Sequence, residues 1–129
     1  MVTQSDDRIT VEPFDGVVNV RFIDAMLAST DRALVLREKG HDPVFYIPFD
    51  DIYFEMMHES QTRTQCPWKG EARYWSTGAV GEAAADVMWA YEEPHGAARP
   101  IAGHGAFYPG KVTIDVTPND SPRRLPDQG

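Results

Sequence analysis

Apolar and polar residues alternate in several short runs of the sequence, and this period of two is typical of β-strands with one buried face. The strongest runs lie at residues 17–23, 44–47, 52–57, 71–76 and 87–91. Residues 26–29 are the expected partner of the first run, whereas residues 33–36 fit either a strand or a short helix. No long run has the 3.6-residue apolar period of an amphipathic helix. The pattern therefore predicts a mainly β protein.

Turn and polar residues set the expected boundaries between these runs. Polar residues 58–65 lack periodicity and are expected to form a loop, and the Thr-Gly pair at 77–78 is expected to end a strand. The Pro-Gly pair at 109–110 fits a type II turn, because proline fixes φ and glycine accepts a positive φ. That turn predicts a hairpin between residues 103–108 and 111–116.

Chain length and composition suit a single domain, since 129 residues with 42% apolar content are enough for one packed core. We expect a flexible lead-in at residues 1–16, one β-rich domain at residues 17–117 and a disordered, Pro-rich tail at residues 118–129. The expected fold consists of antiparallel strands in a sandwich, a tent-like or a partly open barrel arrangement. At most one or two short helices are expected.

The formal net charge of −8 changes which partners are expected. An acidic surface repels phosphate backbones, so nucleic acid is not an expected partner. No apolar run approaches the roughly 20 residues that a membrane span needs, and the acidic start of the chain is unlike a secretory signal. The single cysteine, Cys66, excludes a disulfide within the chain and a cysteine-based zinc cage. These features predict a cytoplasmic protein with no membrane partner.

Reactive, cationic and aromatic residues are concentrated in residues 64–75, which hold the cysteine and two of the three tryptophans. A thiol reacts as the thiolate, which nearby cations favour, and Lys69 follows Cys66 by three residues. His104 is the candidate base from a distant strand, since cysteine–histidine sites need neighbours in space only. A small cysteine packed in the interior beside a tryptophan is the simpler interpretation.

Lys69 and Gly70 are candidates for contact with a phosphate or carboxylate, because lysine supplies a compact charge and glycine lets a ligand approach the backbone. A solvated lysine in a turn is an equally good interpretation. Glu71 and Arg73 share one strand face and form either a surface ion pair or the base and anion clamp of a cleft. The surface pair is the simpler of the two.

The complete set of candidate site residues follows from this clustering. The candidate catalytic residues are Cys66, His104 and Glu71, and the candidate ligand-binding residues are Thr64, Trp68, Lys69, Arg73, Trp75 and Tyr91. The tryptophans would form the walls of the pocket, although packing in the core is the simpler role for Trp75 and Tyr91. No metal site is expected, since the four histidines show neither HxH nor HExxH spacing, and no cofactor is expected.

Several motifs together resemble a known family. They are Tyr46-Ile47-Pro48, Cys66-Pro67-Trp68-Lys69-Gly70, Tyr74-Trp75, Ile101-Ala102-Gly103-His104 and Ala106-Phe107-Tyr108. In this order, over about residues 18–117, they resemble the bacterial domain-of-unknown-function family 427, sometimes labelled nucleotidyltransferase-like. The resemblance implies a small, mainly β, single-domain cytosolic protein and no particular activity. The sequence lacks the glycine-serine motif and paired aspartates that two-metal nucleotidyl transfer would need.

Two interpretations of function follow from the sequence. The first is a small-molecule protein, either a binding module or an enzyme, whose pocket around residues 66–70 holds an anionic ligand. The second is a non-catalytic structural or interaction module in which the same stretch is a packing motif. Metal-dependent hydrolysis ranks last, for lack of ligands. A homodimer is compatible with the sequence, which specifies neither the ligand nor a reaction.

Overall fold

The computed structural model describes residues 8–79 and 81–119, and ten β-strands make up most of these ranges. The strands are β1 (Ile9–Pro13), β2 (Gly16–Phe22), β3 (Ala25–Thr30), β4 (Leu34–Glu38), β5 (Val44–Pro48), β6 (Met57–Cys66), β7 (Gly70–Ala79), β8 (Glu82–Tyr91), β9 (His104–Phe107) and β10 (Thr113–Pro118). The short 3-10 helices of the same ranges are η2 (Phe49–Asp51), η3 (Phe54–Met56) and η4 (Gly96–Ile101). The mainly β class is confirmed, with one more short helix than expected.

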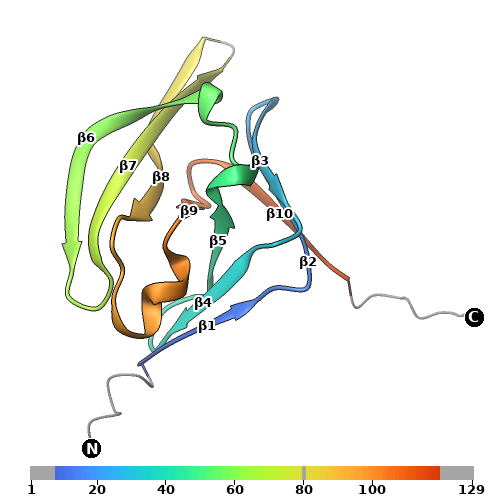
Figure 1. Cartoon of the computed structure of the whole chain (residues 1–129). Coiled ribbons are helices and arrows are strands. Elements are labelled where there is room, and N and C mark those ends of the chain that lie inside the picture. The colour runs from blue at the N-terminus through green and yellow to red at the C-terminus, as the bar shows by residue number, and fades with distance from the viewer. Residues whose placement is uncertain (1–7, 80, 120–129) are drawn as a thin grey trace, which may run out of the picture.

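The strands form two sheets in which every pairing is antiparallel. The large sheet has seven strands in the order β1-β4-β5-β9-β8-β7-β6, and the small sheet has the order β10-β2-β3. Figure 1 shows β6, β7 and β8 on one side of the molecule and the small sheet on the other, with β5 and β9 between them. Because β1 and β6 are unpaired edges, the large sheet is open rather than closed into a barrel.

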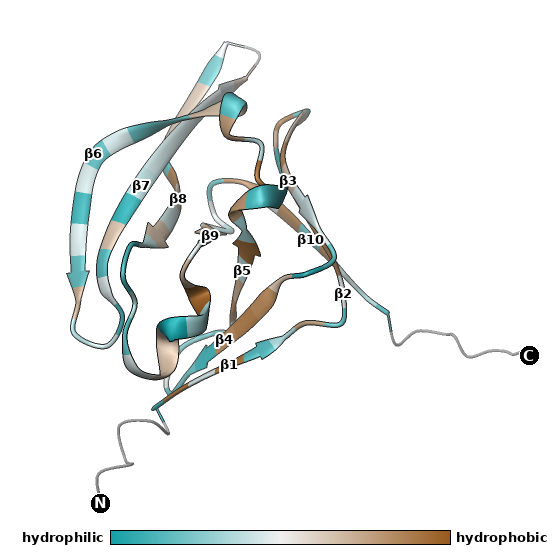
Figure 2. Ribbon diagram, viewed as in Figure 1, coloured by the Kyte–Doolittle hydropathy of each residue, from teal (hydrophilic) through white to brown (hydrophobic). Residues whose placement is uncertain are grey.

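Apolar residues that alternate along the strands face inward and form two buried clusters. The larger cluster contains Val18 and Val20 of β2 together with Ile47 of β5 and Phe107 of β9, so it joins the two sheets. The smaller cluster groups Tyr46 with residues of β1, β4 and η4. Figure 2 shows hydrophobic residues along β4 and β5 and hydrophilic ones along β6. Burial of this apolar surface holds the small sheet against the large one.

Strand β1 lies within the segment that was expected to be a flexible lead-in. It pairs with β4 along its whole length, and Ile9 is buried. Residues 9–13 show little apolar alternation, because an edge strand with one covered face needs few apolar residues, here Ile9 and Val11. At the other end β10 runs to Pro118. The rest of the predicted lead-in and tail, residues 1–7 and 120–129, lies outside the described residues.

The prediction of a loop at the polar residues 58–65 is wrong, because these residues form most of strand β6. An edge strand has one neighbour and an outward face that meets water, so it needs no apolar alternation. Its hydroxyls instead bond to β8: Ser60 and Thr62 donate to the two Asp86 carboxylate oxygens at 2.6 and 2.7 Å. These hydrogen bonds hold the pKa of Asp86 below its ordinary value. They tie β6 to β8 where the β6–β7 register shifts.

The strand prediction over residues 52–57 is wrong, since residues 54–56 form η3 and β6 begins only at Met57. Phe49 and Phe54 pack edge to face with ring centroids 5.4 Å apart, and the Trp75 ring lies 5.8 Å from that of Phe54. Ile52 is buried and bridges to Ala28 of β3. Ile52 is therefore buried and Phe54 partly buried in a compact aromatic group, which does not need an extended backbone, whereas Met56 is exposed.

The Pro-Gly pair at 109–110 makes a turn but not the predicted hairpin. The Lys111 N–H donates to the Tyr108 carbonyl at 2.9 Å across the turn. However, β9 pairs with β5 and β8, whereas β10 pairs with β2. The turn thus passes the chain from the large sheet to the small one. The Thr-Gly pair at 77–78 does not end β7 either, because that strand continues to Ala79.

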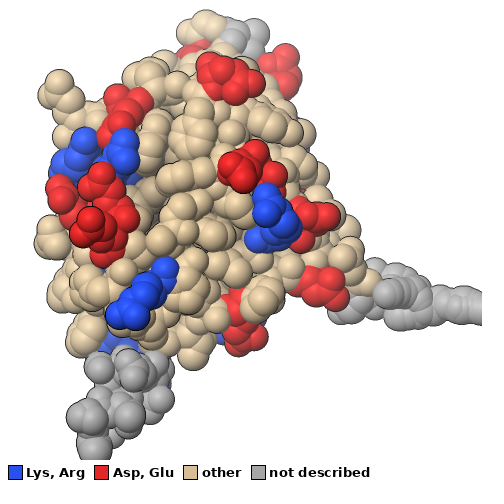
Figure 3. All heavy atoms as spheres, viewed as in Figure 1, with Lys and Arg blue, Asp and Glu red and all other residues tan. Residues whose placement is uncertain are grey.

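Charged side chains on the face in Figure 3 lie in mixed groups rather than in one basic patch. Over β6 and β7, for example, Arg63 and Arg73 both pair with Glu59. Mixed charge of this kind gives no concentrated positive field for a polyanion. Separately, none of the helices in residues 8–79 and 81–119 has the length and apolar character that crossing a membrane requires.

Candidate functional site

A polar cavity of about 180 Å³ lies between β4 and β5 on one side and β7 and β8 on the other. The loop after β4 and the turn between β6 and β7 complete its walls. Its lining includes an acid and a base, Glu38 and Lys69, and the tyrosines Tyr46, Tyr74, Tyr91 and Tyr108. Tyrosine offers an apolar ring and a hydroxyl at once, so such a wall can hold a planar polar molecule.

Lys69 enters this cavity from the turn that joins β6 to β7. The turn closes with Cys66 opposite Gly70, and the Lys69 N–H donates to the Cys66 carbonyl at 3.3 Å. Gly70 has a φ of +106°, at which a side chain is strained, and a Cβ there would lie 3.2 Å from the Glu93 carbonyl oxygen. Glycine thus lets the turn lie against the segment after β8, with Lys69 buried behind it.

Lys69 and Glu38 form an ion pair on the cavity wall. Lys69 Nζ donates to Glu38 Oε1 at 2.8 Å, and the two side chains are only 10% and 12% exposed. The ammonium also lies 5.7 Å from the centre of the Tyr91 ring. Removing two charges from water costs free energy that can cancel their mutual attraction, so a gain in stability is a weak explanation for a pair this buried. It offers a bound molecule an acceptor and several donors at one point.

The buried phenols of the cavity are neutral hydrogen-bonding groups. Burial raises the pKa of Tyr46, Tyr91 and Tyr108 well above the ordinary phenol value. Trp89 Nε1–H donates to the Tyr46 hydroxyl at 3.3 Å, and a hydrogen bond with Tyr74 raises the pKa of Tyr108 further. These hydroxyls therefore keep their protons at neutral pH and can both donate and accept.

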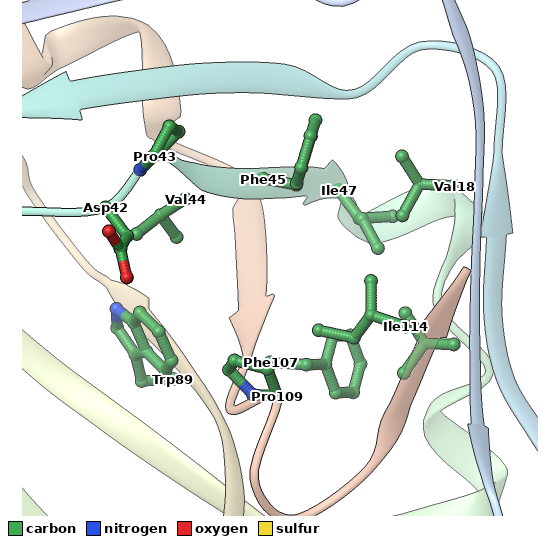
Figure 4. Close-up of a pocket in the computed structure, with 11 residues that line it drawn as sticks. Val18, Asp42, Pro43, Val44, Phe45, Ile47, Trp89, Phe107, Pro109 and Ile114 are labelled. Carbon is green, nitrogen blue, oxygen red and sulfur yellow. The ribbon is translucent and has the colours of Figure 1, made fainter. Parts of the chain in front are cut away.

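An apolar cavity of about 260 Å³ adjoins the polar one and shares Asp42, Val44 and Trp89 with it (Figure 4). Its other walls come from both sheets, including Val18 of β2 and Phe107 of β9. In Figure 4 the Asp42 carboxylate points toward the Trp89 ring at one end of the cavity. The two cavities thus adjoin at the wall that Asp42, Val44 and Trp89 form.

Residues 10–117 match the family model described as a domain of unknown function, DUF427. The chain belongs to the DUF427 family. The resemblance drawn from the sequence motifs is therefore confirmed. No curated protein matches this DUF427 chain. Within residues 8–79 and 81–119 of the domain, no three His, Cys, Asp or Glu side chains gather into a group that could hold a metal ion.

Three of the predicted ligand-binding residues lie at or directly behind the polar cavity of this DUF427 domain. Lys69 and Tyr91 line it. Thr64 lies behind the wall, where its hydroxyl is 2.8 Å from the hydroxyl of Tyr74, a lining residue. The strand-face prediction explains this position, because Tyr74 lies on the opposite face of β7 from Arg73 and Trp75.

The other predicted residues of β7 lie on a different surface. Glu71 is exposed, and Arg73 donates from Nε and Nη2 to the two Glu59 carboxylate oxygens at 2.8 and 2.7 Å. The Arg73 guanidinium lies 5.2 Å from the centre of the Trp75 ring, and Trp75 is itself buried in the core. Arg73 thus belongs to a surface ion pair, but its partners are Glu59 and Glu92 and not the predicted Glu71, and Trp75 is buried in the core.

Cys66, Trp68 and His104 are not lining residues of the polar cavity. Cys66 is half-buried at the end of β6, close enough to Tyr91 for its charge to raise the tyrosine pKa further, after the larger effect of burial. The Trp68 ring is 39% exposed, beneath the Arg8 guanidinium at 4.4 Å. His104 begins β9, and its Nδ1 bonds to a backbone carbonyl oxygen two residues earlier. The structure does not show these three residues converging on one cavity.

Several cavity residues of the DUF427 domain were not predicted from the sequence. Glu38 ends an apolar strand, and nothing local indicates that it faces a lysine 31 residues away. Trp89 fits a core position by its alternation. Tyr46 and Tyr108 appear in the family motifs, but their neighbours in space are set by sheet pairing. The one usable indication was the hydroxyl or N–H group that each of these aromatic rings carries, because such a group needs a hydrogen-bonding partner when it is buried.

Proposed function

We propose that this DUF427 domain binds a small, planar, uncharged molecule in the polar cavity. The observation that carries the proposal is the Lys69–Glu38 pair, buried on a wall of aromatic side chains. Ligand sites are mostly apolar hollows with a few fixed polar groups that orient the bound molecule. This cavity is more polar than most, with Trp89 and Tyr91 as ring surfaces and the ion pair as the orienting group.

The hydrogen-bonding groups of the cavity favour a ligand with both donors and acceptors on one edge. Lys69 uses one of its three N–H donors on Glu38 Oε1, which leaves two donors. The second oxygen of Glu38 is available to accept. An amide group offers a carbonyl and an N–H together, so it matches the donor and acceptor that the pair presents.

The charge of the cavity argues against the anionic ligand that the sequence led us to expect. The Lys69 charge is balanced by Glu38, and Asp42 adds a further carboxylate to the lining. A carboxylate or phosphate would meet two acids, the His41 ring and one lysine that is already paired. Removing an anion from water without an unpaired cation to receive it is unfavourable. The proposal assigns binding to this cavity and no reaction.

A packing role remains the second candidate, because the turn is fixed by contacts that need no ligand. The Lys69–Glu38 pair ties the turn to β4, and Arg8 covers Trp68 on its outer side. In this alternative the stretch from Cys66 to Gly70 is a structural clasp between β4, β6 and β7. If the stretch is only a structural clasp, substitutions of Lys69 or Glu38 should lower the stability of the fold, and no ligand should bind.

Two probes of equal size separate these possibilities: benzamide, which is neutral, and benzoate, which is anionic. Titration into ¹⁵N-labelled protein is followed at the three tryptophan indole N–H signals. Benzamide is expected to shift the Trp89 signal and to leave those of Trp68 and Trp75 unchanged. Benzoate is expected to bind at least about tenfold more weakly, because it faces two carboxylates.

Glu38→Gln sharpens the test, since it keeps the shape of the side chain and leaves Lys69 without its counter-charge. In this variant benzoate should gain affinity relative to benzamide. Glu59→Gln is the matched control, because it removes one carboxylate from an exposed pair outside the cavity. Stronger binding of benzoate by the unaltered protein would return the site to an anionic ligand. Binding of neither probe would reject the proposal in favour of the clasp.

A further inference from the structure

We propose that the ligand is amphiphilic: its planar polar head lies in the polar cavity and an alkyl or aryl substituent enters the apolar cavity between the sheets. This inference rests on the proposed function of the polar cavity. It adds the chemical class of the ligand, an aromatic amide or related ring with an apolar side group.

The shared wall of the two cavities is the first observation that supports this ligand class. They share Asp42, Val44 and Trp89, so one molecule can contact both. Figure 4 shows Asp42 and Trp89 at one end of the apolar cavity and Val18 and Ile114 at the other. A head group at Trp89 would therefore direct its substituent toward the small sheet.

The lining of the apolar cavity decides the chemistry of that substituent. Apart from Asp42 and the Trp89 indole, which belong to the shared end, all its lining residues are hydrocarbon, aromatic or proline side chains. A group that enters past Trp89 meets no side-chain donor or acceptor. Polar atoms there would lose their hydrogen bonds to water, so the substituent must be apolar.

The size of the space is the third observation. It has a volume of about 260 Å³ and is partly open to solvent. Val18 and Phe107 in its walls are almost fully buried, whereas Phe45 of the large sheet and Ile114 of the small one are half-buried. An apolar group in this position would contact both sheets at these two half-buried residues.

A series of 4-alkylbenzamides tests the proposal directly. The dissociation constants of benzamide, 4-ethylbenzamide and 4-butylbenzamide are measured on the full chain by the Trp89 indole shift. Each methylene that enters an apolar cavity should tighten binding about threefold to fourfold. Nuclear Overhauser effects between the butyl protons and the Val18 or Ile114 methyl groups should place the chain between the sheets.

Ile114→Phe is the matched variant, because Ile114 is only half-buried and a larger side chain there would fill the apolar cavity. It should remove the gain from the butyl group and leave benzamide binding unchanged. Val116→Phe adds the same ring to an exposed position of the same strand and should change neither. If Ile114→Phe does not fold, the Overhauser contacts in the unaltered protein decide the question alone.

The outcomes separate the two proposals. Benzamide binding that does not tighten with chain length, or butyl protons that show no contact with Val18 or Ile114, overturns the amphiphilic ligand and leaves the polar site standing. Absence of binding by the whole series overturns the polar site and this inference with it. Tightening along the series that Ile114→Phe abolishes supports both.

Discussion

Two ion pairs near the centre of the chain use similar chemistry in opposite surroundings. Lys69 and Glu38 are 10% and 12% exposed on a cavity wall, whereas Arg73 and Glu59 are 31% and 32% exposed on the outer face of β6 and β7. The two basic residues are only four positions apart in the sequence. Position in the fold, rather than residue type or local sequence, therefore decides which cation is available to chemistry.

The two pairs differ in how much water each cation has lost and in the number of groups that contact it. Arg73 keeps water on one side and makes two parallel hydrogen bonds to one carboxylate, with further contact to Glu92 at 3.4 Å. Lys69 has lost most of its water and depends on one carboxylate and one aromatic ring. A buried pair is therefore sensitive to the loss of one partner, and an exposed pair is not.

The largest expected effect is that of Lys69→Met. It leaves Glu38 buried without a counter-charge, so the free energy of unfolding should fall by about 3 kcal/mol in urea denaturation. The double variant Lys69→Met, Glu38→Met should recover part of this loss, because no unpaired charge remains. Arg73→Met is the matched control and should cost less than about 1 kcal/mol. Equal losses for both lysine and arginine variants would remove the distinction between the pairs.

A smaller effect is expected from Gly70→Ala, which alters the turn that buries Lys69. Alanine at a φ of +106°, with its Cβ 3.2 Å from the Glu93 carbonyl oxygen, should cost about 1–3 kcal/mol. Gly40→Ala is the control: its φ is +83° but nothing lies within 4 Å of its Cβ position, so only about 1 kcal/mol is expected.

Gly70→Ala and Lys69→Met should also be less than additive, since the first already disturbs the pair that the second removes. Thermal or urea unfolding of the two single variants and the double variant measures this coupling. Full additivity would mean that Gly70 plays no part in placing the lysine.

The smallest effect concerns the exposed pair and its dependence on pH and salt. Hydrogen bonding to Arg73 lowers the pKa of Glu59 in the folded protein. Its contribution to stability is therefore present above the unfolded value of about 4.3 and is lost as pH falls through the lower folded value. Glu59→Gln should cost less than about 1 kcal/mol at pH 7 and less still in 1 M salt.

Unfolding curves at pH 7 and pH 3, each at low and high salt, give this comparison. A Glu59→Gln loss that persists unchanged in 1 M salt would show that the pair behaves as a buried one.

Local patterns in the sequence predicted the strands in which apolar and polar residues alternate. Val18 and Val20 alternate in β2 and face the core, and the residues of β5, β7 and β8 follow the same rule. The turn from Cys66 to Gly70 was also predictable, because proline and glycine restrict the backbone independently of what lies around them. The mainly β class and the family follow from these local features.

The predictions were wrong where an element is held by contacts with residues that lie far away in the sequence. The polar edge strand β6 is held by Ser60 and Thr62 through Asp86, which lies more than twenty residues away. Phe54 is partly buried by other aromatic rings and not by a strand face. In the cavity, Lys69 was predicted and its partner Glu38 was not.

The sequence alone determined that this chain forms antiparallel strands, that a proline–glycine turn presents a lysine at its centre, and that the chain belongs to its family. These properties depend on residues close together in the chain. Only the tertiary structure decided that Lys69 meets Glu38, that tyrosines from three strands and a loop face one cavity, and that an apolar cavity adjoins it. The physical reason is that sheet order brings β4, β5, β7 and β8 together, and burial, which controls the energy of a charge, is a property of that assembled neighbourhood.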